Sequence, residues 1–244
     1  MTQTATSASR PRRGPEGCDE EQIRLDCLRL LGLNTERLAG QEELLRSGSL
    51  VRLRAMVPRR RLSLREAEGV AERQAGRLRA ELEVLGPRIG EDELARLPWL
   101  TITHHDKLPS SGLTTKTDYG WLVVLRSSEA KVRQRFSLAH EIKHCLDDPV
   151  VDQLYVQQGG YTAHEQAERV CDRFAAALLM PRVLLRADWA DGLQDIAKLA
   201  KRYDVSRAAM TVRLSQLGLT PPIPRCHGAA GHPALSGAAV EART

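Results

Sequence analysis

The chain has 244 residues, which is enough for one medium-sized domain with extensions. Its 42% apolar and 27% charged residues are typical of a folded protein, and a net charge of +5 is too small by itself to indicate a nucleic-acid-binding protein. Five scattered cysteines without a CxxC pair argue against a disulfide framework, and no apolar run is long enough for a signal peptide or a membrane span. We therefore expect a cytoplasmic protein with no membrane partner.

The two ends of the chain have the composition of disordered tails. Residues 1–18 are rich in Ser, Thr, Pro, Arg and Gly, and residues 220–244 are rich in Pro, Gly and Ala. The second tail contains three metal donors, Cys226, His227 and His232. Because three donors in a flexible segment make a poor metal site, we interpret this tail as unstructured.

Residues 19–61 are predicted to form a helical and basic N-terminal extension. A first helix is expected from Glu20 to Gly32, since apolar residues recur there at helical spacing and a glycine ends the run. Seven arginines and no acidic residue follow between residues 44 and 65. Such a block could bind phosphates or an acidic protein surface. We favour a solvated helix end and linker around Pro58.

A long amphipathic helix is expected next. Ser63 and Glu66 have the spacing of a capping box, and Gly86 with Pro87 should stop the helix. The apolar stripe is expected to include Val70, Leu78, Leu82 and Leu85.

A small β-sheet is predicted after this helix. The runs "WLTITHHD" and "GWLVVLR" have β propensity, and the segment between them contains turns and room for one short strand. Two or three strands among helices predict an α+β, mostly helical fold. His104 and His105 lie near a predicted strand end, and we favour a structural or exposed role for them over a contact with substrate.

The helix that begins near Lys131 contains the sequence His-Glu-Ile-Lys-His. His140 and His144 are one helical turn apart, so both imidazoles can bind one Zn²⁺ at about 2.0–2.1 Å. Glu141 lies beside them, where it can take a proton from the attacking water. Because HExxH occurs by chance in roughly one chain in a hundred of this length, the motif needs a third ligand to support it.

The third ligand could come from an extension of the same motif or from a later helix. An extended HExxHxxGxxH motif is excluded, because Asp147 and Val150 occupy the positions of its glycine and last histidine. A later helix, expected from about Thr162 to Leu179 after a loop over 146–160, offers Glu168 with Asp172 one turn on. Asp172 could then accept a hydrogen bond from a zinc-bound histidine.

Some other side chains near this motif could also bind a metal, and others are expected in the core. His164 and Glu165 compete with Glu168 as the third ligand, although neither has an aspartate one turn on. We expect Cys145, Cys171 and Met180 to be core residues rather than ligands.

The segment 195–219 has the pattern of two short helices. Ser206 is the predicted cap of the second helix, and Arg207 and Arg213 could reach DNA in a helix-turn-helix. We favour packing against the preceding domain, or a grip on a protein substrate, over DNA binding. The residues expected to form the core of the segment are Ile196, Leu199, Val205, Val212 and Leu214.

Over residues 63–219 the sequence resembles the ImmA/IrrE family of metallopeptidases. The similarity is carried by "RQRFSLAHEIKH", by "ERVCDRFAAALLMP", whose family pattern is Glu-x-x-[Ala/Cys]-[Asn/Asp]-x-x-Ala-Ala-x-Leu-Leu-Met-Pro, and by flanking segments. The resemblance implies a gluzincin-like, zincin-like domain over 62–190, followed by a helix-turn-helix-like segment over 191–219. It also implies one Zn²⁺ bound by His140, His144 and Glu168, with Glu141 as general base.

The resemblance further implies a function. Members of this family cut helix-turn-helix repressors and so release genes of mobile elements, prophages or stress responses. We therefore expect a zinc metalloendopeptidase of the anti-repressor type whose substrate is such a repressor. The alternatives are a non-catalytic anti-repressor or DNA-binding regulator, and one partner of a toxin–antitoxin pair.

Overall fold

The computed structural model describes residues 19–33, 48–118, 120–155 and 160–222. The predicted tail over 1–18, nearly all of the tail over 220–244 with its three metal donors, and Arg46 of the arginine block lie outside the described residues. Within the described parts of the chain, no helix is both long and apolar enough to cross a membrane.

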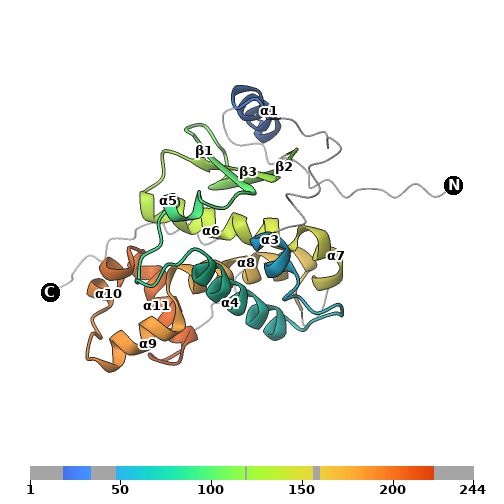
Figure 1. The fold of residues 1–244 in the computed structure, drawn as a ribbon. Helices are drawn as coiled ribbons and strands as arrows, with labels where there is room; N and C mark the ends of the chain where they lie inside the picture. Colours follow the sequence, from blue (N-terminus) through green and yellow to red (C-terminus); the bar gives the residue numbers. More distant parts are fainter. Residues whose placement is uncertain (1–18, 34–47, 119, 156–159, 223–244) are drawn as a thin grey trace.

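The fold is mostly helical with one small sheet (Figure 1). Helices α1 (Glu20–Leu30), α3 (Ser49–Arg54), α4 (Leu64–Glu81) and α5 (Glu91–Leu94) come before the strands β1 (Leu100–His105), β2 (Gly112–Thr117) and β3 (Gly120–Arg126). After them come α6 (Lys131–Asp147), the 3₁₀ turn Asp148–Val150, α7 (Val151–Leu154) and α8 (Ala163–Leu179). The last described helices are α9 (Arg182–Ala190), α10 (Ile196–Tyr203) and α11 (Arg207–Gln216). The α+β prediction is confirmed.

The sheet has the order β1-β3-β2, so β3 is central and β2 lies at one edge. β1 pairs with β3 in parallel and β2 pairs with β3 antiparallel. Alternation along β3 sends Val123 and Leu125 into the main core with α6, and sends Leu122 and Val124 into a second cluster with α1. The sheet therefore lies between α1 and α6, as Figure 1 shows.

Helix α8 is central to the helical layer, because it packs against α4 on one side and α6 on the other. Its small residues Ala175, Ala176 and Ala177 are at most 6% exposed and allow the neighbouring helices to approach closely. Both α4 and α8 begin with a capping box, formed by Ser63 with Glu66 and by Thr162 with Glu165. The predicted starts of these two helices are thus confirmed.

Several predicted details were wrong. α4 ends at Glu81, because the chain turns at Glu83, whose φ of 58° is left-handed, and Leu85 is 86% exposed instead of lying in the apolar stripe. The expected loop over 146–160 contains the end of α6, a 3₁₀ turn and α7. Val212, expected in the core, is 45% exposed.

The C-terminal helices α10 and α11 share the main core. Leu199, Val205, Met210 and Leu214 belong to one buried cluster with residues of α4, α6 and α8. Ser206 caps α11, as predicted, by accepting a hydrogen bond from Ala209 N at 3.1 Å. Residues on both sides of the predicted boundary at 190 and 191 therefore pack together, as we favoured.

Buried and half-buried arginines satisfy the free carbonyls at helix C-termini. Arg54 donates to Cys145 O at 2.7 Å and Leu146 O at 3.3 Å, at the end of α6. Arg79 donates to Leu178 O at 2.9 Å and Arg213 to Met180 O at 3.1 Å, at the end of α8. Arg54 thus departs from the solvated linker that we favoured. Arg213, which was considered only as a possible DNA contact, has a fully buried side chain.

Candidate metal centre

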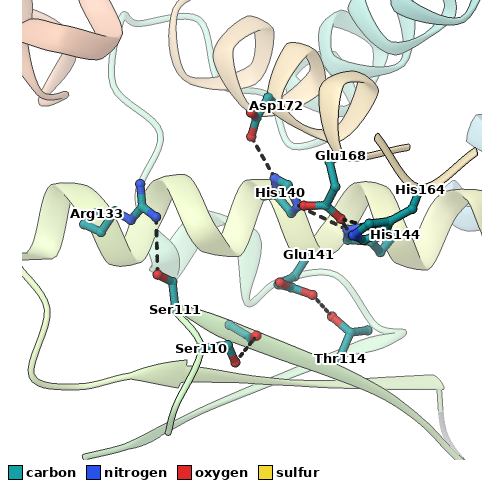
Figure 2. A network of polar contacts seen from close by, with 11 residues as sticks. Ser110, Ser111, Thr114, Arg133, His140, Glu141, His144, His164, Glu168 and Asp172 are labelled. Carbon is teal, nitrogen blue, oxygen red and sulfur yellow. Dashed lines mark hydrogen bonds and ion pairs between the residues drawn. The ribbon is translucent and has the colours of Figure 1, made fainter. Parts of the chain in front are cut away.

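The two histidines of the motif face one point on the α8 side of α6 (Figure 2). His140 Nε2 and His144 Nε2 lie 3.1 Å apart, and their ring centroids are 4.9 Å apart. Their spacing of four residues on a continuous helix gives this placement, since one turn takes 3.6 residues.

Helix α8 brings Glu168 to the same point. One of its carboxylate oxygens lies 3.5 Å from His140 Nε2 and the other lies 3.4 Å from His144 Nε2. Ligands of a tetrahedral zinc ion at its usual bond lengths lie roughly 3.3–3.5 Å from one another. The three donors therefore fit a metal ion of this kind without a change in the positions of the helices.

Asp172 lies one turn after Glu168 and contacts the other nitrogen of His140. The distance from its Oδ1 to His140 Nδ1 is 2.9 Å. An aspartate in this position keeps the proton on Nδ1 and directs the lone pair of Nε2 toward the centre. The arrangement agrees with the role predicted for Asp172.

Contacts between the histidines and the carboxylates shift the pKa values of His140 and Glu168. Burial lowers the pKa of His140, but hydrogen bonds with Asp172 and Glu168 outweigh it and raise this pKa to about 10. Burial raises the pKa of Glu168, but hydrogen bonds from His140 and His144 hold that pKa well below its usual range. Without a metal, the centre therefore holds a proton on His140 between two carboxylates.

Glu141 lies beside the histidines on α6 and faces the edge strand β2 (Figure 2). The hydroxyl of Thr114 donates a hydrogen bond to Glu141 Oε2. Gly112 leaves room for the same carboxylate, because a Cβ there would lie 2.8 Å from Glu141 Oε1. Neither residue was predicted, and their only signal in the sequence was a small and polar stretch, "GLTT", in the segment between the two predicted strands.

Lys143, inside the motif, points away from the centre into the core. Its Nζ lies 2.5 Å from Asp147 Oδ1 and 2.9 Å from Gln74 Oε1, and all three side chains are buried. Tyr155 donates to the other oxygen of Asp147. This network ties α6 to α4 and to the segment after α7, and so fixes the rotation of the helix that presents the two histidines.

Of the alternative third ligands, Glu165 is held in a capping box and His164 lies at the exposed edge of the centre. Glu165 accepts from Thr162 N at 2.8 Å in the capping box, and the His164 side chain is 68% exposed with Nδ1 at 3.9 Å from Glu168. His104 pairs with Glu91 at 3.3 Å, and His105 accepts a hydrogen bond from Lys107 N at 3.2 Å. The structural role expected for the last two histidines is therefore supported.

The sulfur-containing residues near the motif are in the core, as predicted. Cys145, Cys171 and Met180 are all 0% exposed. Burial raises the pKa of Cys145 and of Cys171 well above the usual thiol value, so both thiols are protonated when no metal is present. Cys171 has a second property that the sequence analysis missed: its sulfur and one ring nitrogen each of His140 and His144 all lie within 4.8 Å of one another.

Comparisons with known proteins indicate a family of peptidases. A peptidase family described as the IrrE N-terminal-like domain matches residues 100–215, which include both motif helices. The "Radiation response metalloprotease IrrE" of Deinococcus deserti is 34% identical over 108 residues, which are 42% of this chain and 38% of that protein. The protein with this description from Deinococcus radiodurans is 30% identical over 102 residues, 39% of this chain and 31% of that protein.

A solved structure, a "Mycobacterium tuberculosis transcriptional regulator", aligns with 69% of this chain and 52% of its own, with 13% identity and a TM-score of 0.46. The match spans only 38% and 31% of the lengths of the two curated relatives. Both relatives are metalloproteases, and the family profile covers the helices that carry His140, His144 and Glu168. Residues 100–215 therefore match this peptidase family, in agreement with the resemblance that the motifs predicted.

Proposed function

We propose that this chain is a zinc-dependent endopeptidase whose general base is Glu141 and whose metal ligands are His140, His144 and Glu168. The observation that carries the proposal is the meeting of two imidazole nitrogens and one carboxylate at mutual distances of 3.1–3.5 Å. Two neutral nitrogens and one carboxylate are a donor set that catalytic zinc sites use, with one position left open.

The residues around the centre have distinct tasks in this proposal. A bound zinc ion supplies Lewis-acid polarisation of the scissile carbonyl and of the attacking water. Glu141 takes the proton of that water and passes it to the leaving amine. Thr114 orients the Glu141 carboxylate through its hydrogen bond, and Asp172 orients the His140 ring.

We further propose that the substrate is a helix-turn-helix repressor, cut to release genes of a mobile element, a prophage or a stress response. This part of the proposal rests on the resemblance to the ImmA/IrrE family. Direct DNA binding, which we did not favour, loses support because Arg213 is buried and only Arg207 of the two possible DNA contacts is exposed. A non-catalytic anti-repressor is the competing function.

The test is co-expression of the full chain with the helix-turn-helix protein encoded beside it, followed by detection of fragments. We expect cleavage by the wild type, and Glu141→Gln should keep zinc while losing cleavage by at least about a hundredfold. Glu165→Gln is the matched control, because glutamine also serves in a capping box and Glu165 lies outside the centre. Derepression without fragments, undiminished in Glu141→Gln, would favour the non-catalytic anti-repressor.

A further inference from the structure

The positive charge of this chain is concentrated between residues 49 and 81, in α3, α4 and the turn that joins them. This segment contains nine arginines, no lysine and four glutamates, so its net charge of +5 equals that of the whole chain. It lies outside residues 100–215, which match the peptidase family. The family match therefore gives no reason for this charge.

Contacts inside the protein involve two of these arginines and two of the glutamates. Arg54 and Arg79 donate to main-chain carbonyls at the ends of α6 and α8. Glu68 and Glu72 pair with arginines of α8 and α11 at N–O distances of 2.6–3.6 Å. The other seven arginines of the segment are all exposed.

Most of these exposed arginines have no acidic partner. Three of them share the two remaining glutamates, at N–O distances of 2.7–2.9 Å. One of these pairs, between Arg60 and Glu66, holds the turn before α4 against the first turn of that helix. The four arginines for which no ion pair is recorded among the described residues, and which we call the basic face, are Arg59, Arg61, Arg65 and Arg73.

The outer side of α4 combines arginines with glycines. It carries Arg65 and Arg73, whereas the opposite side of the helix packs against α8 (Figure 1). Eight residues separate the two arginines, so they are about 12 Å apart along the helix axis. Gly69 lies between them and Gly76 follows, and a Cβ at Gly76 would meet no atom within 4 Å. Packing therefore does not require Gly76, although glycine weakens a helix, and the low surface lets a large ligand approach the helix beside the arginines.

We propose that the basic face binds the phosphate backbone of duplex DNA and does not read its base sequence. The planar guanidinium of arginine forms two parallel hydrogen bonds with phosphate oxygens. Duplex DNA carries about one negative charge per 1.7 Å of its axis, so arginines along a helix can contact several phosphates at once. The reduced support for DNA binding concerns only Arg207 and Arg213 of α11, which are not part of the basic face. Binding here would place the peptidase beside a DNA-bound repressor, and this consequence alone rests on the proposed function.

Other anionic partners fit the segment less well. Single-stranded nucleic acid is bound by stacking on aromatic side chains, and residues 49–81 contain no aromatic residue. Protein interfaces depend on a few buried aromatic or apolar anchors. Val51 is the one large hydrophobic residue exposed in this segment. Charge without such anchors favours a regular array of phosphates over an acidic protein surface.

The test is binding of the full-length protein to a fluorescein-labelled duplex of about 20 base pairs, followed by fluorescence anisotropy in increasing KCl. Contacts with four phosphates predict that the logarithm of the association constant falls with the logarithm of salt with a slope of about −4. Arg65→Gln/Arg73→Gln, which keeps good helix formers, should weaken binding by at least about tenfold and reduce the slope by about 2. Arg65→Lys/Arg73→Lys should retain most of the slope, because both charges remain.

The matched control is Lys198→Gln/Arg207→Gln, which removes two exposed charges from α10 and α11. It should bind DNA within about twofold of the wild type. A control variant that loses binding while Arg65→Gln/Arg73→Gln keeps it would overturn the proposal in favour of the C-terminal helices. Wild-type protein that binds no duplex at low salt would also overturn it.

Two competitors test the chemistry of the ligand. Polyglutamate that displaces the duplex at equal charge would assign the basic face to an acidic protein, and tighter binding of a single strand of the same length would exclude a duplex-specific surface. DNA binding should persist after zinc is removed with a chelator and in Glu141→Gln. Its loss would therefore leave the proposed peptidase standing, and a failure to detect cleavage would leave DNA binding standing.

Discussion

Arg213 Nη1 lies 2.6 Å from Glu72 Oε1, and this ion pair joins α11 to α4 across the main core. The Arg213 side chain is 0% exposed, whereas that of Glu72 is 27% exposed. Arg173 of α8 lies 3.6 Å from the same glutamate, so three helices meet at one carboxylate. Helix α11 is thus held on the domain by an ion pair with a buried arginine as well as by apolar contacts.

Removal of Arg213 should destabilise the protein. Arg213→Ala should lower the free energy of unfolding by about 3 kcal/mol, because it leaves Met180 O without its donor and Glu72 with one partner fewer. Arg213→Met should cost less, since its side chain fills the space. Urea unfolding followed by circular dichroism measures both, and Arg207→Ala, exposed on the same helix, should change stability by less than about 0.5 kcal/mol. Equal effects at the two arginines would contradict the assigned structural role.

Arg54 should matter for the end of the motif helix. Arg54→Ala removes the donors to Cys145 O and Leu146 O, and we expect a loss of about 2 kcal/mol in the free energy of unfolding. Arg59→Ala in the same basic block, at an exposed position, should be nearly neutral. Chemical denaturation of the two variants makes the comparison, and a neutral Arg54→Ala would mean that water replaces the guanidinium at these carbonyls.

Thr114 should affect catalysis through Glu141 rather than stability. Thr114→Val removes the hydroxyl that bonds the carboxylate, and the rate of substrate cleavage should fall by about tenfold with KM little changed. Thr114→Ser should recover the rate because it keeps the hydroxyl. Thr115→Val on the other face of β2 is the control, and single-turnover cleavage assays would show whether the effect is confined to position 114.

Metal affinity should rise with pH. The pKa of His140 in the metal-free protein is raised from 6.5 to about 10, so near pH 7 the metal must displace its proton. Affinity should increase by up to about tenfold per pH unit until the pH nears this pKa, as measured by competition with a chelator. The charged contacts of His140 stabilise the metal-free fold fully below about pH 6.5, and this contribution is lost as pH rises through about 10. In Asp172→Asn both pH dependences should weaken, because a cause of the raised pKa is gone.

The local signals in the sequence were sufficient for much of the fold. The capping residues Ser63 and Thr162 begin their helices as expected, and both apolar runs became strands. These features depend on a few neighbouring residues, so a sequence pattern can reveal them. The convergence of His140 and His144 is also set locally, because a helix directs side chains four residues apart to the same side.

The remaining features depend on packing between distant segments. Arg213 was considered only as a possible DNA contact, because sequence alone does not reveal that the carbonyls at the end of α8 need a donor. The contact of Thr114 with Glu141 arises only when β2 takes the edge of the sheet beside α6. The turn that ends α4 has a left-handed residue, Glu83, where glycine is usual. The sequence therefore gave no indication of where this helix ends.

The position of α8 couples the metal centre to the far end of the domain. On its α6 side α8 carries Glu168 and Asp172, and its Arg173 bonds Gln216 at 2.8 Å and Glu68 at 3.2 Å. A ligand that binds only the folded state adds its binding free energy to the whole cooperative unit. Loading the centre with metal should therefore slow amide exchange in α11. It should also protect α11 from proteases, although α11 does not contact the ion.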